Sequence, residues 1–235
     1  MPNTSFQFKQ FLIDQAADGM KVTTDGCILG ALINEVSKGN ILDIGTGTGL
    51  LSLMLAQRTK AKIHALEIDE KVAHQAVENV KNSPWPDQIS VLHQDFKTYE
   101  TETIYDQIIC NPPFFKNSHK GQSKSKNTAI HDDSLSMDSL IKKSKKLLAN
   151  QGTLWVMYPA YEMDQFAQLA TTSGLKLNKQ TFIYNQSGGS VFRVIAEFIN
   201  GQIKKSTSRN LTIKKADGSY TEEFSVLLKD YYLHL

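Results

Sequence analysis

The residues best suited to chemistry directly follow the apolar run 105–110, and they read Asn111-Pro112-Pro113-Phe114-Phe115. Such a run is typical of a buried parallel strand, and ligands bind at the carboxyl ends of these strands. Because two prolines remove a hydrogen-bond donor and fix φ, the strand must end in a rigid turn that presents Asn111 and Phe114. The Asn111 side-chain carbonyl and the Pro112 backbone carbonyl can accept both protons of a planar NH2 group, while Phe114 stacks on its plane. The motif predicts a site for such a group, although Asn-Pro alone is more often a plain strand-ending turn.

A glycine-rich turn forms a second candidate site. The buried-strand pattern 41–44 and the apolar helix pattern 50–57 flank the turn Gly45-Thr46-Gly47-Thr48-Gly49. Glycines let the backbone approach a ligand, and a helix start offers free N–H groups. The dinucleotide fingerprint would need its third glycine where Leu50 stands, and no lysine follows to complete a phosphate-binding loop. Because Asp43 would also repel a pyrophosphate, the turn predicts a nucleoside ligand with a cationic or zwitterionic tail.

Two carboxylates end the next predicted strand, 62–66. Glu67 stands twenty positions beyond Gly47, which is the spacing at which a carboxylate meets a ribose diol. Asp69 suits the cap of a following helix that carries apolar residues on one face between positions 72 and 80. We therefore expect Glu67 to bind the ligand and Asp69 to cap the helix.

A third strand pattern, 89–92, delivers another acid. Asp95 can accept a hydrogen bond from the amino group of an adenine while Phe96 packs nearby. The alternative is that Asp95 caps its own loop, as short acidic side chains often do.

The segment after the proline turn is basic. Between positions 116 and 126 it contains no acid, and its cations are Lys116, Lys120, Lys124 and Lys126. One interpretation is a solvated, flexible loop. The other is that these lysines and Phe115 grip the phosphates and bases of an RNA, because they follow the reacting motif directly. Lys204 and Lys205 are weaker candidates for the same role.

Composition narrows the class of protein. The chain has 235 residues, 40% hydrophobic and 21% charged, which fits one globular domain with an N-terminal arm, 1–25, and a C-terminal extension, 200–235. Neither a leader pattern nor a membrane-length apolar stretch occurs, so we expect a cytoplasmic protein. Cys27 and Cys110 lack metal-site spacing and are expected to be buried packing residues, so no metal is predicted. A net charge of +2 does not decide on a partner.

The local patterns predict an α/β fold with a seven-stranded, mostly parallel sheet, an antiparallel edge hairpin and helices on both faces. The expected strands are 41–44, 62–66, 89–92, 105–110, 153–158, 175–184 and 190–198. The expected helices, besides the one carrying positions 72–80, are 27–36, 50–57, 137–150, 163–171 and 222–232. The alternating aromatic run 6–11 suits a short strand or an extended arm laid against this domain.

In order, the motifs Asp43-x-Gly45-x-Gly47-x-Gly49, Glu67, Asp95-Phe96 and Asn-Pro-Pro-Phe resemble the class I S-adenosylmethionine-dependent methyltransferases with a Rossmann-like fold. The ends of the chain narrow the resemblance to the bacterial tRNA(Val) adenine-N6 methyltransferases, and it covers essentially the whole chain. The segments that carry this narrower resemblance are Phe6 to Phe11, Met20 to Gly26, Tyr220 to Phe224 and Tyr231 to Leu233.

The resemblance implies methyl transfer from S-adenosylmethionine to the exocyclic N6 of the adenine beside the anticodon of a valine tRNA. It places Gly45, Gly47 and Glu67 on the cofactor, Asp95 on the cofactor's adenine, and 111–114 on the target base. Relatives carry Arg before the His near position 131, where this chain has Ile130. His131 is therefore assigned no role. No obligate protein partner is expected.

Two other functions are open at this point. A protein glutamine N5 methyltransferase would also present a planar NH2 to an Asn-Pro-Pro-aromatic motif, but it resembles a longer chain with an added N-terminal helical domain. A non-catalytic RNA-binding module could keep the cofactor fold as a vestige, and the intact Asn111 and Glu67 argue against it. A DNA adenine methyltransferase would need a larger duplex-reading region.

Overall fold

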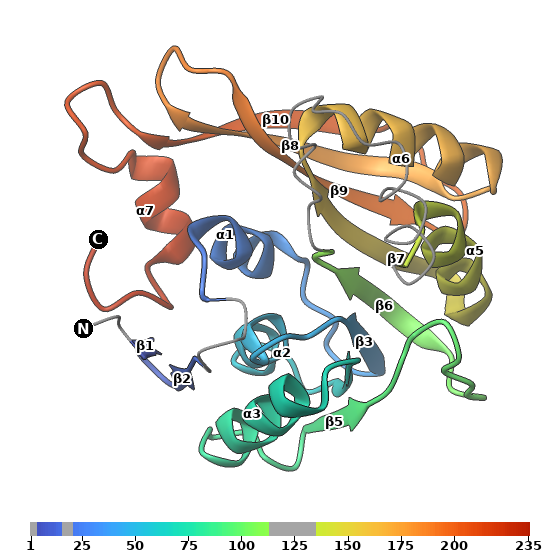
Figure 1. The fold of residues 1–235 in the computed structure, drawn as a ribbon. Coiled ribbons are helices and arrows are strands. Elements are labelled where there is room, and N and C mark those ends of the chain that lie inside the picture. The colour runs from blue at the N-terminus through green and yellow to red at the C-terminus, as the bar shows by residue number, and fades with distance from the viewer. Residues whose placement is uncertain (1–3, 16–20, 113–134) are drawn as a thin grey trace, which may run out of the picture.

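The computed structural model describes residues 4–15, 21–112 and 135–235, and its centre is one twisted sheet with helices on both faces (Figure 1). In spatial order the strands are β10 (Thr207–Lys214), β8 (Lys176–Gln186), β9 (Val191–Ile199), β7 (Leu148–Tyr158), β6 (Tyr105–Cys110), β3 (Asn40–Ile44), β4 (Lys62–Glu67) and β5 (Ile89–His93). Every neighbouring pair is parallel except the two that involve β9. The α/β class and the mostly parallel sheet predicted from the sequence are confirmed.

The strand count differs from the prediction, because the sheet has eight strands and not seven. The eighth, β10, pairs in parallel with β8 and covers the hairpin that was expected to form the edge. Its first four residues, 207–210, are exposed, and its buried side chains are Leu211 and Ile213. Two alternating apolar residues are too few to predict a strand from the sequence. The segment becomes a strand because it pairs with β8.

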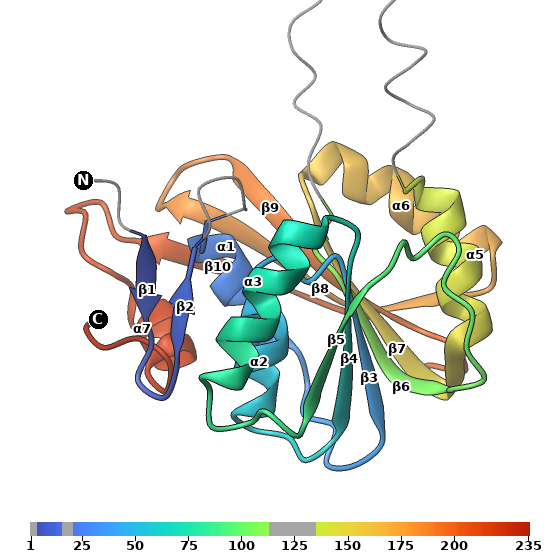
Figure 2. The same ribbon diagram turned by 60° about the horizontal axis from the view of Figure 1, so that its bottom comes forward.

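The helices lie in two layers (Figure 2). On one face are α1 (Thr24–Leu32), α2 (Leu50–Ala56), α3 (Glu70–Lys81) and α7 (Glu222–Leu228), and on the other are α5 (Met137–Leu147) and α6 (Ala160–Thr172). Successive strand residues alternate between the two apolar cores: Ile108 packs with α5 and α6, while Ile109 packs with α1 and α2. Both faces are therefore covered, as parallel strands require.

Several boundaries shift from their predicted positions. Helix α5 ends at Leu147 and not at Asn150, because Leu148 turns extended and pairs with Tyr105 at the start of β7. Helix α1 begins at Thr24 and ends at Leu32, and α7 ends at Leu228. The apolar pattern by itself fixes a helix end only to within a few residues.

The N-terminal aromatic run packs against the C-terminus. Strands β1 (Ser5–Gln7) and β2 (Leu12–Asp14) form an antiparallel hairpin, and Phe8 bridges to Tyr232. The Phe8 ring is fully buried and stacks 4.5 Å from the Phe11 ring. Core packing of this run, predicted from its alternation, is confirmed.

Candidate active site

The predicted site residues meet at one edge of the sheet. Strands β3, β4, β5 and β6 are parallel, so their carboxyl ends lie side by side. The glycine turn follows β3, Glu67 ends β4, Asp95 follows β5, and Asn111 follows β6. The strands thus bring together residues that lie up to 68 positions apart in the sequence, between Asp43 and Asn111.

The glycine turn takes backbone conformations that favour glycine. Its φ angles are +69° at Gly45, +60° at Gly47 and +88° at Gly49. A Cβ built on Gly45 or Gly47 would meet no atom within 4 Å, so the turn is open on that side. Glycine is needed here for the left-handed φ, and the open side leaves room for a ligand to approach the backbone.

Asp43 lies beneath the turn and is fully buried. Its Oδ2 accepts hydrogen bonds from the Thr46 and Ser52 hydroxyls, both at 2.7 Å. Within the described chain, its Oδ1 is buried without a hydrogen-bond partner. Burial raises the pKa of the Asp43 carboxyl to about 6, and the two hydroxyl hydrogen bonds oppose that rise. Asp43 therefore ties the turn to the start of α2 and sets a titratable charge under the site.

Glu67 contacts the glycine turn from the end of β4. Its Oε2 accepts from the Gly47 backbone N–H at 2.9 Å, and its Oε1 accepts from those of Ile68 and Asp69 at 2.9 and 3.0 Å. Asp69 caps α3 by accepting from the Lys71 and Val72 N–H groups. The capping role predicted for Asp69 is confirmed, and Glu67 is held against the turn where a ligand would lie.

Ile68 is a residue that the sequence analysis missed. Its side chain is 59% exposed at the same edge, between Glu67 and the capped helix. An apolar residue directly after the last residue of a strand was the available signal. Such a side chain gains burial when a flat apolar ligand covers it.

Asp95 caps its own loop, whereas the neighbouring Phe96 lies in the apolar core. Asp95 Oδ1 accepts from the Lys97 N–H at 2.7 Å, and its Oδ2 lies 3.9 Å from the Lys97 ammonium. This is the loop-capping arrangement considered for Asp95 from the sequence. Phe96 is 4% exposed and belongs to the core beside α5, with the Lys143 ammonium 5.3 Å from its ring centroid.

Asn111 ends β6 with its side chain turned inward. The Asn111 Oδ1 is buried and has no hydrogen-bond partner within the described chain. A buried amide oxygen without a partner costs free energy, about 1 to 3 kcal/mol, and such groups are found where a ligand supplies the partner. Pro112 is half-buried. The calls on Phe114, Phe115, His131 and the four lysines between 116 and 126 lie outside the described residues.

The first turn of α1 lies beside Asn111. Thr23 caps the helix by accepting from the Gly26 N–H at 3.2 Å. A Cβ on Gly26 would lie 3.3 Å from Leu50 Cδ2 and 4.0 Å from Asn111 Nδ2. Gly26 therefore lets the helix lie close to Leu50 at the start of α2, with the Asn111 amide nearby, a role that the sequence did not reveal.

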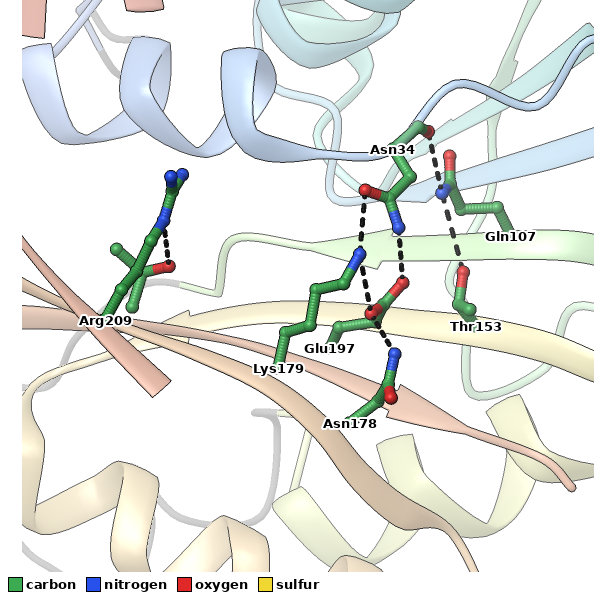
Figure 3. Close-up of polar contacts among 8 residues, drawn as sticks. Asn34, Gln107, Thr153, Asn178, Lys179, Glu197 and Arg209 are labelled. Atoms are coloured by element: carbon green, nitrogen blue, oxygen red, sulfur yellow. Dashed lines mark hydrogen bonds and ion pairs between the residues drawn. The ribbon is translucent and has the colours of Figure 1, made fainter. Parts of the chain in front are cut away.

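Two polar contacts join α1 and the residue region just after it to strand β9. At the start of the helix, the Arg193 Nε lies 3.1 Å from the Asp25 Oδ2, and both side chains are largely buried. Just after its end, Asn34 donates to the buried carboxylate of Glu197 at 2.9 Å (Figure 3). Lys179 completes the second contact, 3.5 Å from Glu197 and 3.0 Å from the Asn34 oxygen. Strand β9 thus fixes the helix that borders Asn111.

The two cysteines are buried packing residues, as predicted. Cys27 and Cys110 are buried and unpaired thiols, and burial raises the pKa of Cys27 to about 12. The described residues include no cluster of His, Cys, Asp or Glu arranged to hold a metal ion. Across those same ranges, no helix is long and apolar enough to cross a membrane.

Comparison with known proteins gives the class. The methyltransferase small domain family matches residues 25–172. A predicted O-methyltransferase from Agrobacterium tumefaciens has the same fold, with a TM-score of 0.67 at 17% identity over 87% of this chain and 95% of that one. A methyltransferase from Pyrococcus furiosus has a TM-score of 0.60 at 18% identity, over 82% and 90% of the two chains. The fold and the site define a class I methyltransferase.

Similar proteins of known name specify the family. A tRNA1(Val) (adenine(37)-N6)-methyltransferase from Phocaeicola vulgatus is 43% identical over 100% of both chains. Proteins of the same name from Bacteroides fragilis and Aliivibrio salmonicida are 40% and 39% identical, over 100% and 99% of both chains. The chain belongs to the tRNA1(Val) (adenine(37)-N6)-methyltransferase family, which confirms the resemblance inferred from its motifs.

The ion pair between Asp25 and Arg193 can be tested by a double-mutant cycle. Arg193→Ala should lower the free energy of unfolding by about 1.5 to 3 kcal/mol, because a hydrogen bond to a charged group is lost and Asp25 stays largely buried. Asp25→Asn in that background should cost little more, because the partner is already absent. Urea unfolding of the single and double variants measures both values. Additive losses would contradict a direct coupling of the two side chains.

Proposed function

We propose that this protein transfers a methyl group from S-adenosylmethionine to the exocyclic N6 of an adenine in tRNA, namely the adenine 3′ of the anticodon in a valine tRNA. The observation that carries the proposal is the buried, unpartnered Asn111 Oδ1 at the sheet edge that also holds the open glycine turn. The names of the similar proteins support the choice of tRNA and of the adenine.

The cofactor side rests on the residues around the glycine turn. Glu67 would accept the ribose hydroxyls, and Gly45 and Gly47 would let the cofactor lie against the backbone. Ile68, more than half exposed, would cover one face of the cofactor's adenine. S-adenosylmethionine supplies a sulfonium-activated methyl group, so this side of the site has to bind and aim rather than activate.

Four further residues belong to the cofactor side of the proposal: Asp95, Phe96, Asp43 and Gly49. Asp95 would accept from the adenine amino group through the oxygen that does not cap the loop, and Phe96 would support that loop from the core. Because Asp43 is fully buried, we expect it to act through its charge and through the turn that it holds, including Gly49.

The target side rests on Asn111 and Pro112. An adenine N6 lone pair is delocalised into the ring and is a poor nucleophile. The Asn111 side-chain carbonyl and the Pro112 backbone carbonyl would each accept one N6 proton, which draws the nitrogen toward tetrahedral geometry. Phe114 would stack on the ring and hold it in line with the methyl group. Correct placement of two reactants can lower a barrier by up to about 7 to 11 kcal/mol.

No strong general base is required near Asn111. The amino nitrogen becomes acidic only after it has received the methyl group, and the proton then leaves to solvent or to a carbonyl acceptor. Phe115, Lys116, Lys120, Lys124 and Lys126 are proposed to hold the RNA around the reacting base.

The proposed function is tested by the identity of the methylated product. Unmodified total tRNA and unmodified release factor are incubated separately with radiolabelled S-adenosylmethionine, then digested, and the labelled unit is identified. We expect label in N6-methyladenosine from valine tRNA. Label only in protein glutamine would establish the other methyltransferase activity, and no label in any substrate would favour a non-catalytic RNA-binding module.

Asn111→Ala should lower kcat by about a hundredfold or more and leave cofactor affinity nearly unchanged, because its carbonyl is needed mainly as N6 becomes tetrahedral. Single-turnover methylation and calorimetry with S-adenosylmethionine measure the two effects. Asn210→Ala, which removes an exposed amide on β10, is the matched control and should change neither. Full activity of Asn111→Ala would show that the Asn-Pro motif does not take part in methyl transfer.

Cofactor affinity should depend on the ionisation of Asp43. Its pKa is raised by burial to about 6, so the carboxyl is protonated below that pH and ionised above it. Because S-adenosylmethionine carries a net positive charge, we expect its affinity to fall as pH decreases through about 6. Calorimetry between pH 5 and 8 measures the profile, with Asp43→Asn as the comparison. An equally steep profile in Asp43→Asn would contradict the assignment.

A further inference from the structure

Strand β10 ends in a second set of residues on the side of the sheet where Asn111 lies. Because β10 is parallel to β8 and β9 is antiparallel to both β8 and β7, β10 runs in the same direction as β6. Its carboxyl end therefore points toward the side of the sheet on which Asn111 lies. Along the paired registers Cys110 is level with Ser208, so Lys214 lies about five residues, or about 16 Å, beyond the level of Asn111. With four strand spacings of about 4.8 Å between β6 and β10, Lys214 is roughly 25 Å from Asn111.

Two exposed turns form a ledge at this place. We call residues 186–190 and 214–219 the two-turn ledge. The Ser187 N–H donates to the Lys214 carbonyl at 3.1 Å, and the Gln186 side chain donates to the Ala216 carbonyl at 3.2 Å. The two turns are thus joined to each other, and both project from the sheet beyond α1 (Figure 1).

The backbone of the ledge is accessible to a ligand. Gly188 and Gly218 have φ angles of +78° and +87°, and a Cβ on either would meet no atom within 4 Å. All residues of both turns are exposed. Turns with open glycines leave room for the close approach of a phosphate.

The charge of the ledge fits a polyanion. Lys214 and Lys215 are exposed, and neither forms an ion pair at contact distance with any of the described residues. The acid of the ledge, Asp217, accepts instead from the Ser219 N–H and hydroxyl at 2.9 and 2.6 Å. The Lys214 ammonium lies 5.9 Å from the ring centroid of Tyr220, which is 39% exposed. An aromatic ring beside a cation is a common RNA contact.

The other end of β10 shows why position matters. Lys204 and Lys205 are equally exposed, but they precede the strand. The eight residues of β10 span about 26 Å, so these lysines lie near the opposite edge of the sheet. The sequence alone made Lys204 and Lys205 candidates for RNA contact, whereas the topology favours Lys214 and Lys215.

We propose that the two-turn ledge binds the sugar–phosphate backbone of the substrate RNA. The inference rests on the proposed function, because Asn111 fixes where the reacting base must lie. A distance of roughly 25 Å corresponds to about seven stacked nucleotides at 3.4 Å each. The ledge would therefore contact the helical stem that closes the reacting loop.

The test compares two lysine pairs on one strand. Lys214→Ala/Lys215→Ala and Lys204→Ala/Lys205→Ala each remove two positive charges from exposed positions. Binding of an unmodified valine tRNA transcript is measured by fluorescence anisotropy from 50 to 250 mM KCl. Initial rates of methylation give kcat and KM, and calorimetry with S-adenosylmethionine serves as the folding control.

We expect the first pair to weaken tRNA binding about tenfold and to reduce the salt slope by about 0.7 to 0.9 per lost contact. It should raise KM while kcat and cofactor affinity stay unchanged, and the second pair should leave all five values unchanged. The ledge proposal would be overturned if the first double variant bound tRNA as tightly as the wild type, or if both double variants lost equal tRNA affinity. Absence of tRNA methylation by the wild type would overturn the proposed function itself, and the ledge with it.

Discussion

The site depends on the point where the direction of strand addition reverses in the sheet. The chain places β3 in the middle, adds β4 and β5 on one side, and then crosses to add β6 and β7 on the other. At such a point the loops that follow β3 and β6 diverge, and the crevice between them accepts ligands. The glycine turn and Asn111 lie on its two sides, so a methyl donor on one side can face an acceptor on the other.

Helix α1 lies beside Asn111, and it is held in part by a strand encoded more than 150 residues later. Arg193 and Glu197 lie on the same face of β9 and hold the start of α1 and the residue just after its end, through Asp25 and Asn34. These charged contacts are largely buried, so losing one partner would leave an unpaired charge in a poorly solvated place. The antiparallel strand thus does more than complete the sheet. It fixes the helix whose Gly26 lies against Asn111.

The C-terminal part of the chain contributes to the same edge in another way. Strand β10 extends the sheet beyond β8, and α7 packs on it, so the sheet continues past the candidate site to exposed lysines. A small protein can thereby hold an RNA at two separated places on one continuous sheet. A rigid sheet fixes the distance between those places, which a flexible tail could not do.

The sequence by itself determined the features that depend on local chemistry. Glycines at 45, 47 and 49, the acid at the end of β4, the Asp69 cap and the Asn-Pro end of β6 are each specified within a few residues, and their motifs also identified the family. The roles of Phe114, Phe115 and the loop lysines stay predictions. Tertiary structure alone decided the pairing of β10, the contact of Asp25 with Arg193 and the proximity of Gly26 to Asn111. These features join residues 28 to 168 positions apart, and nothing in the local pattern at either end specifies the partner.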